Sequence, residues 1–135
     1  MKDHGTLTAA AIEAREKSYS PYSGFATGAA LLCENGKIYT GTNVESASYG
    51  VTVCAERVAL FKAVADGERS FRSIAVVGGR AGEKISGYCP PCGACRQALA
   101  EFCSDDMKII LTDGKEEKVI SLGELLPLRF DKDNL

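Results

Sequence analysis

Two short cysteine-containing segments constrain the fold of this 135-residue chain more than any other feature. The first reads Val53-Cys54-Ala55-Glu56, and the second reads Pro91-Cys92-Gly93-Ala94-Cys95. Apolar residues recur at helical spacing after both segments, so each segment is expected to begin a helix. The three thiols can act together only if the two helix starts meet at one point in space. The fold must therefore bring together segments that are far apart in the sequence.

The residue pattern predicts helices and strands in alternation. Thr6 or Thr8 is expected to cap a first helix that ends near Tyr19. Residues 26–33 and 37–42 are expected to form a hairpin, because the Asn-Gly pair between them favours a tight turn. After a loop over 43–53, the pattern predicts helices at 54–66, 92–102 and 122–126, the last capped by Ser121, and strands at 71–77 and 107–111, the first closed by Gly78-Gly79.

This order of elements favours an α/β fold. Helices on both faces of a sheet give a three-layer αβα sandwich, and the mixed central sheet should be parallel in its middle, where helices separate the strands. The length and a hydrophobic content of 45% suit one compact unit with its own core. We therefore expect a single domain over residues 1–135.

The charge and cysteine content narrow the classes of function. A formal net charge of -2 argues against a polynucleotide partner, because nucleic-acid-binding surfaces are usually basic. Charges interrupt the N-terminal apolar residues too early for a secretory signal, and no stretch is long enough for a membrane helix. Six cysteines without such a signal suggest reduced thiols and a cytoplasmic location.

The cysteines have the number and spacing of a zinc site with one position left open. Cys92 and Cys95 lie three positions apart, on one face of a helix, and thiols at helix N-termini have lowered pKa values. With Cys54 they offer three thiolates, whereas a structural zinc site is closed by four protein ligands. The open position can hold a water, whose pKa zinc lowers to about 7. Glu56 is close enough in sequence to move protons for that water, as in the zinc deaminases that act on nucleobases.

Two other cysteine arrangements remain open at this point. Cys89 could join the three cysteines as a fourth ligand and make the zinc structural, which would suit a zinc-stapled binding module. The spacing that begins at Cys89 also has features of an iron–sulfur run, but Leu99 stands where a further cysteine is needed. The other cysteines and the single histidine are expected in the core or in a frayed N-terminus, not at a metal: Cys33, Cys103 and His4.

Along nearly its whole length the chain resembles the cytidine deaminases, specifically the small homotetrameric zinc-dependent type. The matching segments are Tyr22-Ser23-Gly24-Phe25, Gly41-Thr42-Asn43-Val44-Glu45, Cys54-Ala55-Glu56-Arg57, Ala59-Leu60-Phe61-Lys62-Ala63, Pro91-Cys92-Gly93-Ala94-Cys95-Arg96-Gln97 and Leu125-Leu126-Pro127. The resemblance implies a cytidine deaminase-like fold and the hydrolysis of cytidine and 2′-deoxycytidine to the uridines, with release of ammonia, in pyrimidine salvage. It also implies one Zn²⁺ per chain and a homotetramer with shared active sites.

The resemblance assigns the metal chemistry to particular residues. Cys54, Cys92 and Cys95 would be the zinc ligands, and Glu56 would shuttle protons while a zinc-bound hydroxide attacks C4 of the base. Three thiolates carry net negative charge around the zinc ion. We expect Arg57 to offset that charge by donating hydrogen bonds to the sulfurs.

The resemblance also implies the substrate contacts. Phe25 would pack against the pyrimidine, Asn43 and Glu45 would hold the ribose hydroxyls, and the backbone of Ala55 would contact the base. Glu45 would repel a 5′-phosphate, which favours a free nucleoside as the substrate. A deaminase for a cytosine-containing antibiotic nucleoside is the alternative within this chemistry, but it would need a reshaped sugar pocket. Two aromatic residues are implied to reach a neighbouring subunit: Tyr49 and Phe130.

Overall fold

The computed structural model describes residues 3–135, so Met1 and Lys2, at the start of the segment weighed above as a secretory signal, lie outside the described residues. Five strands form one mixed sheet in the order β2-β1-β3-β4-β5. Their bounds are β1 Phe25–Cys33, β2 Ile38–Thr42, β3 Phe71–Arg80, β4 Lys108–Thr112 and β5 Glu117–Ser121. β3 and β4 are parallel, and the other neighbours are antiparallel. The predicted mixed sheet with a parallel centre is confirmed.

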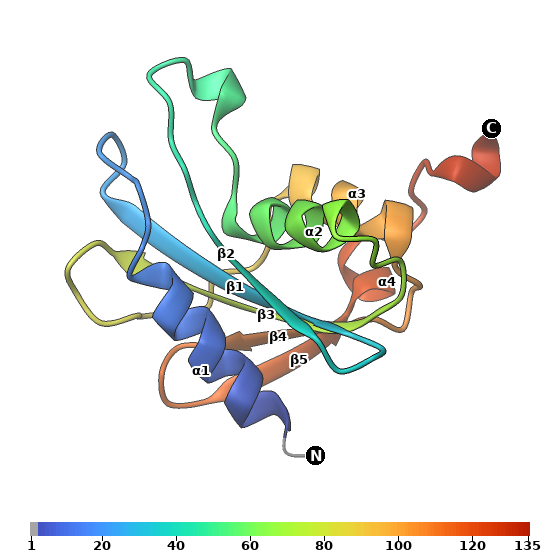
Figure 1. The fold of residues 1–135 in the computed structure, drawn as a ribbon, viewed down its shortest axis with the longest axis horizontal. Coiled ribbons are helices and arrows are strands. Elements are labelled where there is room, and N and C mark those ends of the chain that lie inside the picture. Colours follow the sequence, from blue (N-terminus) through green and yellow to red (C-terminus); the bar gives the residue numbers. More distant parts are fainter. Residues whose placement is uncertain (1–2) are drawn as a thin grey trace.

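Helices cover both faces of this sheet (Figure 1). α1 (Asp3–Arg15) lies on one face, and α2 (Ala55–Ala65) and α3 (Gly93–Phe102) lie on the other, with the short α4 (Leu122–Leu125) beside them. Two single 3-10 turns complete the fold, η1 at Tyr49–Val51 and η2 at Lys132–Asn134. The three-layer αβα arrangement is therefore confirmed.

The alternation of side chains along the central strand produces two separate cores. On β3, Ile74 and Val76 pack with the buried residues of α2 and α3, whereas Ala75 and Val77 pack with α1. Successive residues of a strand point to opposite faces, so a strand buried on both sides is apolar throughout. The α2–α3 side of the sheet is also the side on which the predicted metal ligands lie.

The structure differs from the sequence-based predictions at the N-terminal helix. α1 begins at Asp3 and ends at Arg15, so neither threonine caps it and His4 is part of the helix. Thr8 lies inside the helix and donates its hydroxyl to the carbonyl oxygens of His4 (2.8 Å) and Gly5 (3.2 Å). The alanines that follow Thr8 favour a helix, and the burial of Leu7 against the sheet stabilises the turn before them, so the capping preference of threonine is outweighed.

Two strand predictions also need correction. β3 does not stop at Gly78-Gly79 but continues to Arg80, because it pairs with β1 over that strand's whole length and Arg80 faces Phe25. β5, at Glu117–Ser121, was not predicted, since its charged and half-exposed residues give no clear alternation. By contrast, the capping role of Ser121 is confirmed: it forms a reciprocal capping box with Glu124.

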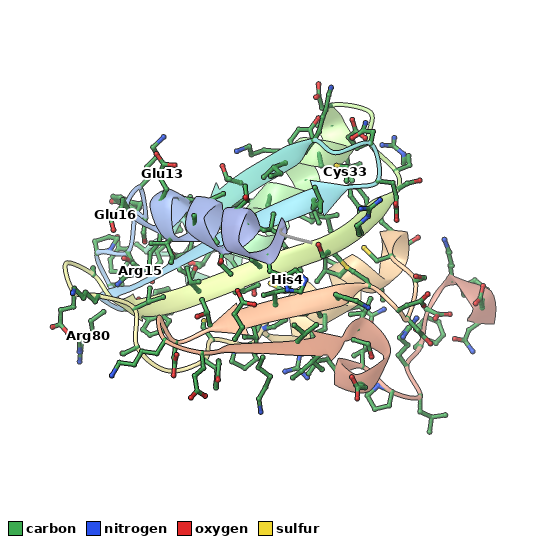
Figure 2. The ribbon with its side chains drawn as sticks, turned by 90° about the horizontal axis from the view of Figure 1, so that it is seen from below. His4, Glu13, Arg15, Glu16, Cys33 and Arg80 are labelled. Carbon is green, nitrogen blue, oxygen red and sulfur yellow. The ribbon has the colours of Figure 1, made fainter. Side chains whose placement is uncertain are left out.

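The end of α1 is fixed to the end of the sheet by a buried arginine. Arg15 donates through Nε to the carbonyl oxygen of Ala26 (3.1 Å) and through Nη2 to those of Arg80 (2.6 Å) and Glu83 (2.7 Å). Figure 2 shows Arg15 and Arg80 at the same end of the sheet, away from Cys33. These bonds hold together the start of β1, the end of β3 and the loop after β3. No helix within residues 3–135 has the length and apolar character needed to span a membrane.

Candidate active site

The three predicted metal ligands lie together at the starts of two helices. The Sγ atoms of Cys54, Cys92 and Cys95 are all within 4.8 Å of one another. Cys54 and Cys92 are separated by 3.7 Å, and Cys92 and Cys95 by 3.5 Å. Cys54 is the N-cap of α2 and Cys92 the N-cap of α3, and neither side chain caps its helix, which leaves both sulfurs available. The predicted convergence of the two helix starts is thus observed.

The sulfur positions suit a tetrahedral zinc ion. Zinc–sulfur bonds of about 2.3 Å place the sulfurs of a tetrahedral site about 3.8 Å apart, close to the separations found here. Cys95 is buried and Cys92 is exposed, so the cluster opens toward solvent on one side. Three thiolates, with space for a fourth ligand from solvent, match the donor set of a catalytic zinc site.

Cys89, the fourth ligand of the alternative closed site, is not a member of this cluster. Its side chain instead packs against Gly78 of β3. A four-cysteine structural site is therefore not formed.

The packing of α2 on β2 sets the position of Cys54. A Cβ at Gly41 of β2 would lie 2.4 Å from the carbonyl oxygen of Ala55 and 2.6 Å from the amide nitrogen of Ala59, so only glycine permits this approach. Val44 and Val53 exchange a pair of backbone hydrogen bonds of 3.0 Å that close the loop between β2 and α2. Two adjacent constraints therefore hold the start of α2.

The cysteines differ in how readily they lose a proton. Hydrogen bonding from Cys95 and from Arg57 lowers the pKa of Cys54 to about 5, despite partial burial. Hydrogen bonding to Cys54, followed by burial, raises the pKa of Cys95. Cys54, at a helix N-terminus where negative charge is stabilised, therefore loses its proton more readily than Cys95.

Glu56 is the buried carboxyl group beside the cluster. It is 5% exposed. Its pKa is raised to about 7, mainly by burial and also by the charge of Cys54, although its own backbone amide, Arg57 and Cys95 act to lower it. Removal from water disfavours the charged form of a carboxyl group, which is the physical reason for the shift.

Arg57 takes the predicted position next to the sulfurs. Its Nη2 donates to Cys54 Sγ at 3.7 Å, and this bond raises the pKa of the guanidinium. Its Nε is buried and has no hydrogen-bond partner within the described part of the chain. The side chain thus brings a positive charge to the cluster.

Asn43 has a fully oriented side-chain amide. Its Oδ1 accepts from the Ser18 hydroxyl (2.6 Å) and from the Thr27 amide (3.0 Å), and its Nδ2 donates to the Phe25 carbonyl oxygen (2.9 Å). An amide nitrogen carries two N–H bonds, so one remains for another partner. These contacts fix the amide before any ligand arrives.

Glu45 is held by the turn that precedes β1. Its Oε1 accepts from the amides of Tyr22 (3.0 Å) and Ser23 (3.1 Å), and its Oε2 accepts from the Ser23 hydroxyl. The hydrogen bond from the Ser23 hydroxyl, supported by the two amides, holds the pKa of this carboxyl group below its usual range. Glu45 is therefore a preorganised carboxylate.

The remaining predicted site residues differ in exposure. Ala55 is fully buried at the first position of α2, and Phe25 is 42% exposed at the start of β1. Tyr49 is 62% exposed and lies edge-on to Tyr22, with ring centroids 6.0 Å apart. Phe130 is 64% exposed, and its carbonyl oxygen accepts from Gln97 of α3 at 2.9 Å. The side chains of Tyr49 and Phe130 are therefore largely exposed to solvent in this chain.

Sequence reasoning gave no role to three residues that orient the site. Ser18 and Ser23 fix the two polar side chains described above. Arg96 donates to the carbonyl oxygens of Pro91 (2.7 Å) and Leu125 (2.8 Å), which fixes the loop next to Cys92. No local pattern identifies these partners, because all of these contacts except that of Arg96 with Pro91 join segments that are far apart in the sequence.

Comparisons with known proteins show the family to which this chain is similar. The family model for the "Cytidine and deoxycytidylate deaminase zinc-binding region" matches residues 1–111. A cytidine deaminase of Sporosarcina psychrophila is 48% identical over 130 residues, covering 96% of this chain and 92% of its own length. One of Halalkalibacterium halodurans is 46% identical over 134 residues, covering 98% of both chains.

Solved structures of cytidine deaminases are also similar to this chain. The crystal structure of cytidine deaminase from Burkholderia pseudomallei superposes with a TM-score of 0.86 at 48% identity, covering 94% of this chain and 98% of that one. The family model spans most of the sequence, and these relatives match it almost from end to end. This chain therefore belongs to the cytidine deaminase family.

Proposed function

We propose that this protein is a zinc-dependent hydrolase that converts cytidine and 2′-deoxycytidine to uridine and 2′-deoxyuridine, with one water consumed and one ammonia released. The observation that carries this proposal is the open three-cysteine cluster with the buried carboxyl group of Glu56 beside it. The named activity of the relatives at 46–48% identity supports it.

Each residue near the cluster has a role in the proposed reaction. Zinc held by Cys54, Cys92 and Cys95 would supply Lewis acidity and lower the pKa of water toward neutrality. Glu56 would accept a proton from the attacking water and pass it to N3 of the base, and would later move the remaining proton of that water, then on the C4 hydroxyl, to the leaving amino group. The guanidinium of Arg57 would offset the negative charge of the thiolates.

The oriented polar pair of Asn43 and Glu45 favours a nucleoside substrate. Asn43 keeps one N–H free, and the Glu45 carboxylate keeps acceptor capacity, so both can bind ribose hydroxyls without rearrangement. A phosphate near Glu45 would be repelled by its negative charge. Phe25 would pack against the pyrimidine, and the backbone of Ala55 would contact the base. The intact pair gives no support to the antibiotic-nucleoside alternative.

The deciding experiment compares wild type with Glu56→Gln, both loaded with zinc, by following the ultraviolet absorbance of cytidine. We expect wild type to convert cytidine and the variant to be inactive while its zinc content, measured by atomic spectroscopy, stays at one per chain. Wild-type protein with one zinc per chain and no turnover would contradict the proposal. Cytidine 5′-phosphate serves as the matched poor substrate.

We further propose that the chain acts as a homotetramer whose subunits complete one another's sites. The loop between β2 and α2 and the C-terminal tail both extend beyond the layer of α2 and α3 (Figure 1). They carry the exposed aromatic side chains of Tyr49 and Phe130. A closed homo-oligomer would cover them.

A mixing experiment tests shared sites. Glu56→Gln lacks the proton carrier but keeps Phe130, and Phe130→Ala has the opposite defect. If sites are shared, co-expressed tetramers of the two variants recover activity that neither variant shows alone. Activity no higher than the sum of the two separate variants would exclude a shared Phe130.

Cellular context follows from the same chemistry. Conversion of free nucleosides suits a role in pyrimidine salvage. All six cysteines are free thiols, which suits the reducing conditions of the cytoplasm. We propose that residues 1–135 form one domain, because the five strands join a single sheet.

A further inference from the structure

The side chains of Cys89 and Phe25 both pack over Gly78 of the central strand β3. A Cβ at Gly78 would lie 2.7 Å from Cys89 Sγ, 3.0 Å from Cys89 Cβ and 2.9 Å from Phe25 Cε2. Side chains do not pack this closely on any residue other than glycine. Cys89 and Phe25 therefore occupy the space above one Cα atom, and we name this pair the Phe25–Cys89 wall.

The wall lies on the same face of the sheet as the cysteine cluster. Ile74 and Val76 of β3 pack with α2 and α3, and strand alternation places Gly78 on that face as well. The antiparallel pairing of β1 with β3 places Phe25 beside this position. Thr27 pairs with Gly78, and Phe25 lies two residues from Thr27 on the same face of β1. The face that carries the wall is thus the face that meets the two helix starts.

Cys89 lies close enough to the cysteine cluster for the charges there to affect its pKa. Burial, together with the charges of Glu56, Cys54 and Cys92, raises the pKa of Cys89 to about 11. Cys89 is consequently a neutral thiol at physiological pH, and a neutral thiol behaves as a small hydrophobic group. Together with the phenyl ring of Phe25, it presents an apolar surface beside an otherwise charged site.

Only one edge of a cytosine ring suits such a surface. O2, N3 and the amino group at C4 are polar, and under the proposed function C4 and N3 face the metal cluster and Glu56. The C5–C6 edge carries only C–H groups and can be buried against apolar atoms without loss of hydrogen bonds. We propose that the Phe25–Cys89 wall receives the C5–C6 edge and that Cys89 determines how large a substituent the site accepts at C5.

This inference rests on the proposed function. It is tested by the preference for the 5-methyl compound, which is the ratio of its kcat/KM, or of its affinity, to that of the unsubstituted compound. The zinc-loaded wild type, Cys89→Ala and Cys89→Leu would be assayed for kcat/KM with cytidine and 5-methylcytidine. The dissociation constants of uridine and 5-methyluridine would be measured by calorimetry. One methylene group in an apolar pocket changes specificity by at least tenfold. We expect Cys89→Ala to raise the preference for the 5-methyl compound by about tenfold and Cys89→Leu to lower it by about tenfold.

A general loss of structure would reduce activity with both substrates in both variants and would leave the ratio unchanged. Cys33→Ala is the matched control, because Cys33 is also a buried thiol but lies at the other end of β1 from Phe25. Phe25 pairs with Arg80, and Figure 2 shows Arg80 and Cys33 at opposite ends of the sheet. The preference of Cys33→Ala for the 5-methyl compound should equal that of wild type. Equal ratios in wild type and both Cys89 variants would overturn the inference. If wild type fails to convert cytidine, the proposed function is wrong, and the binding ratios still decide the role of Cys89.

Discussion

Replacing Gly41 with alanine tests whether the close packing of α2 on β2 controls the candidate active site. The added Cβ would lie 2.4 Å from the Ala55 carbonyl oxygen, whereas ordinary contact begins near 3.4 Å. The helix must therefore move away from the strand by about 1 Å, because the opposing atoms are backbone and cannot rotate aside. Overpacking of this kind costs about 1–3 kcal/mol of unfolding free energy. The shift would also carry Cys54 and Glu56 away from the ligands on α3.

We expect Gly41→Ala to lower the unfolding free energy by about 1–3 kcal/mol in urea titrations. Its kcat for cytidine should fall by roughly 100-fold, because a misplacement of about 1 Å has that effect on catalysis. Gly5→Ala is the control: it also adds a methyl group, but in α1 and with no atom within 4 Å. Alanine favours helices, so this control should be at least as stable as wild type and fully active. Wild-type stability and kcat in Gly41→Ala would refute the reasoning.

Three further outcomes follow from individual contacts. Ser23→Ala removes the main hydrogen bond that lowers the pKa of Glu45, so that pKa should rise in a carboxyl NMR titration. Because a lowered folded pKa stabilises above the unfolded value, the stability difference between wild type and Ser23→Ala should shrink below about pH 4.3; a difference independent of pH would contradict this. Thr27→Val removes a buried hydroxyl that has no partner among the described residues, and should leave stability unchanged or raise it by about 1 kcal/mol in urea titrations. Removal of zinc by a chelator should lower the melting temperature by roughly 10 °C in calorimetry, with recovery when zinc is added back, and an unchanged value would argue against a bound metal.

Local chemistry explains why so much of the site could be predicted. The cysteine spacing, the Asn-Gly turn and the cap at Ser121 each act within a few residues, so a linear pattern contains them. Helical periodicity after Cys54 and Cys92 gave α2 and α3 nearly to their ends. The order of elements then limited the architecture to a sheet covered on both faces.

Contacts between distant segments decided the rest. Gly78 and Gly79 read as the end of a strand, but pairing with β1 extends β3 through both. The spacing of Cys89 allowed a fourth metal ligand, and only the fold shows its sulfur against Gly78, outside the cluster. No sequence pattern gave Ser23 a role, whereas the fold places its hydroxyl on Glu45. By itself the sequence determined the metal-binding chemistry and the helices that carry it, because those depend on short-range geometry. Only the tertiary structure decided which side chains surround the metal-binding cysteines, because strand pairing and packing act between residues that lie far apart in the sequence.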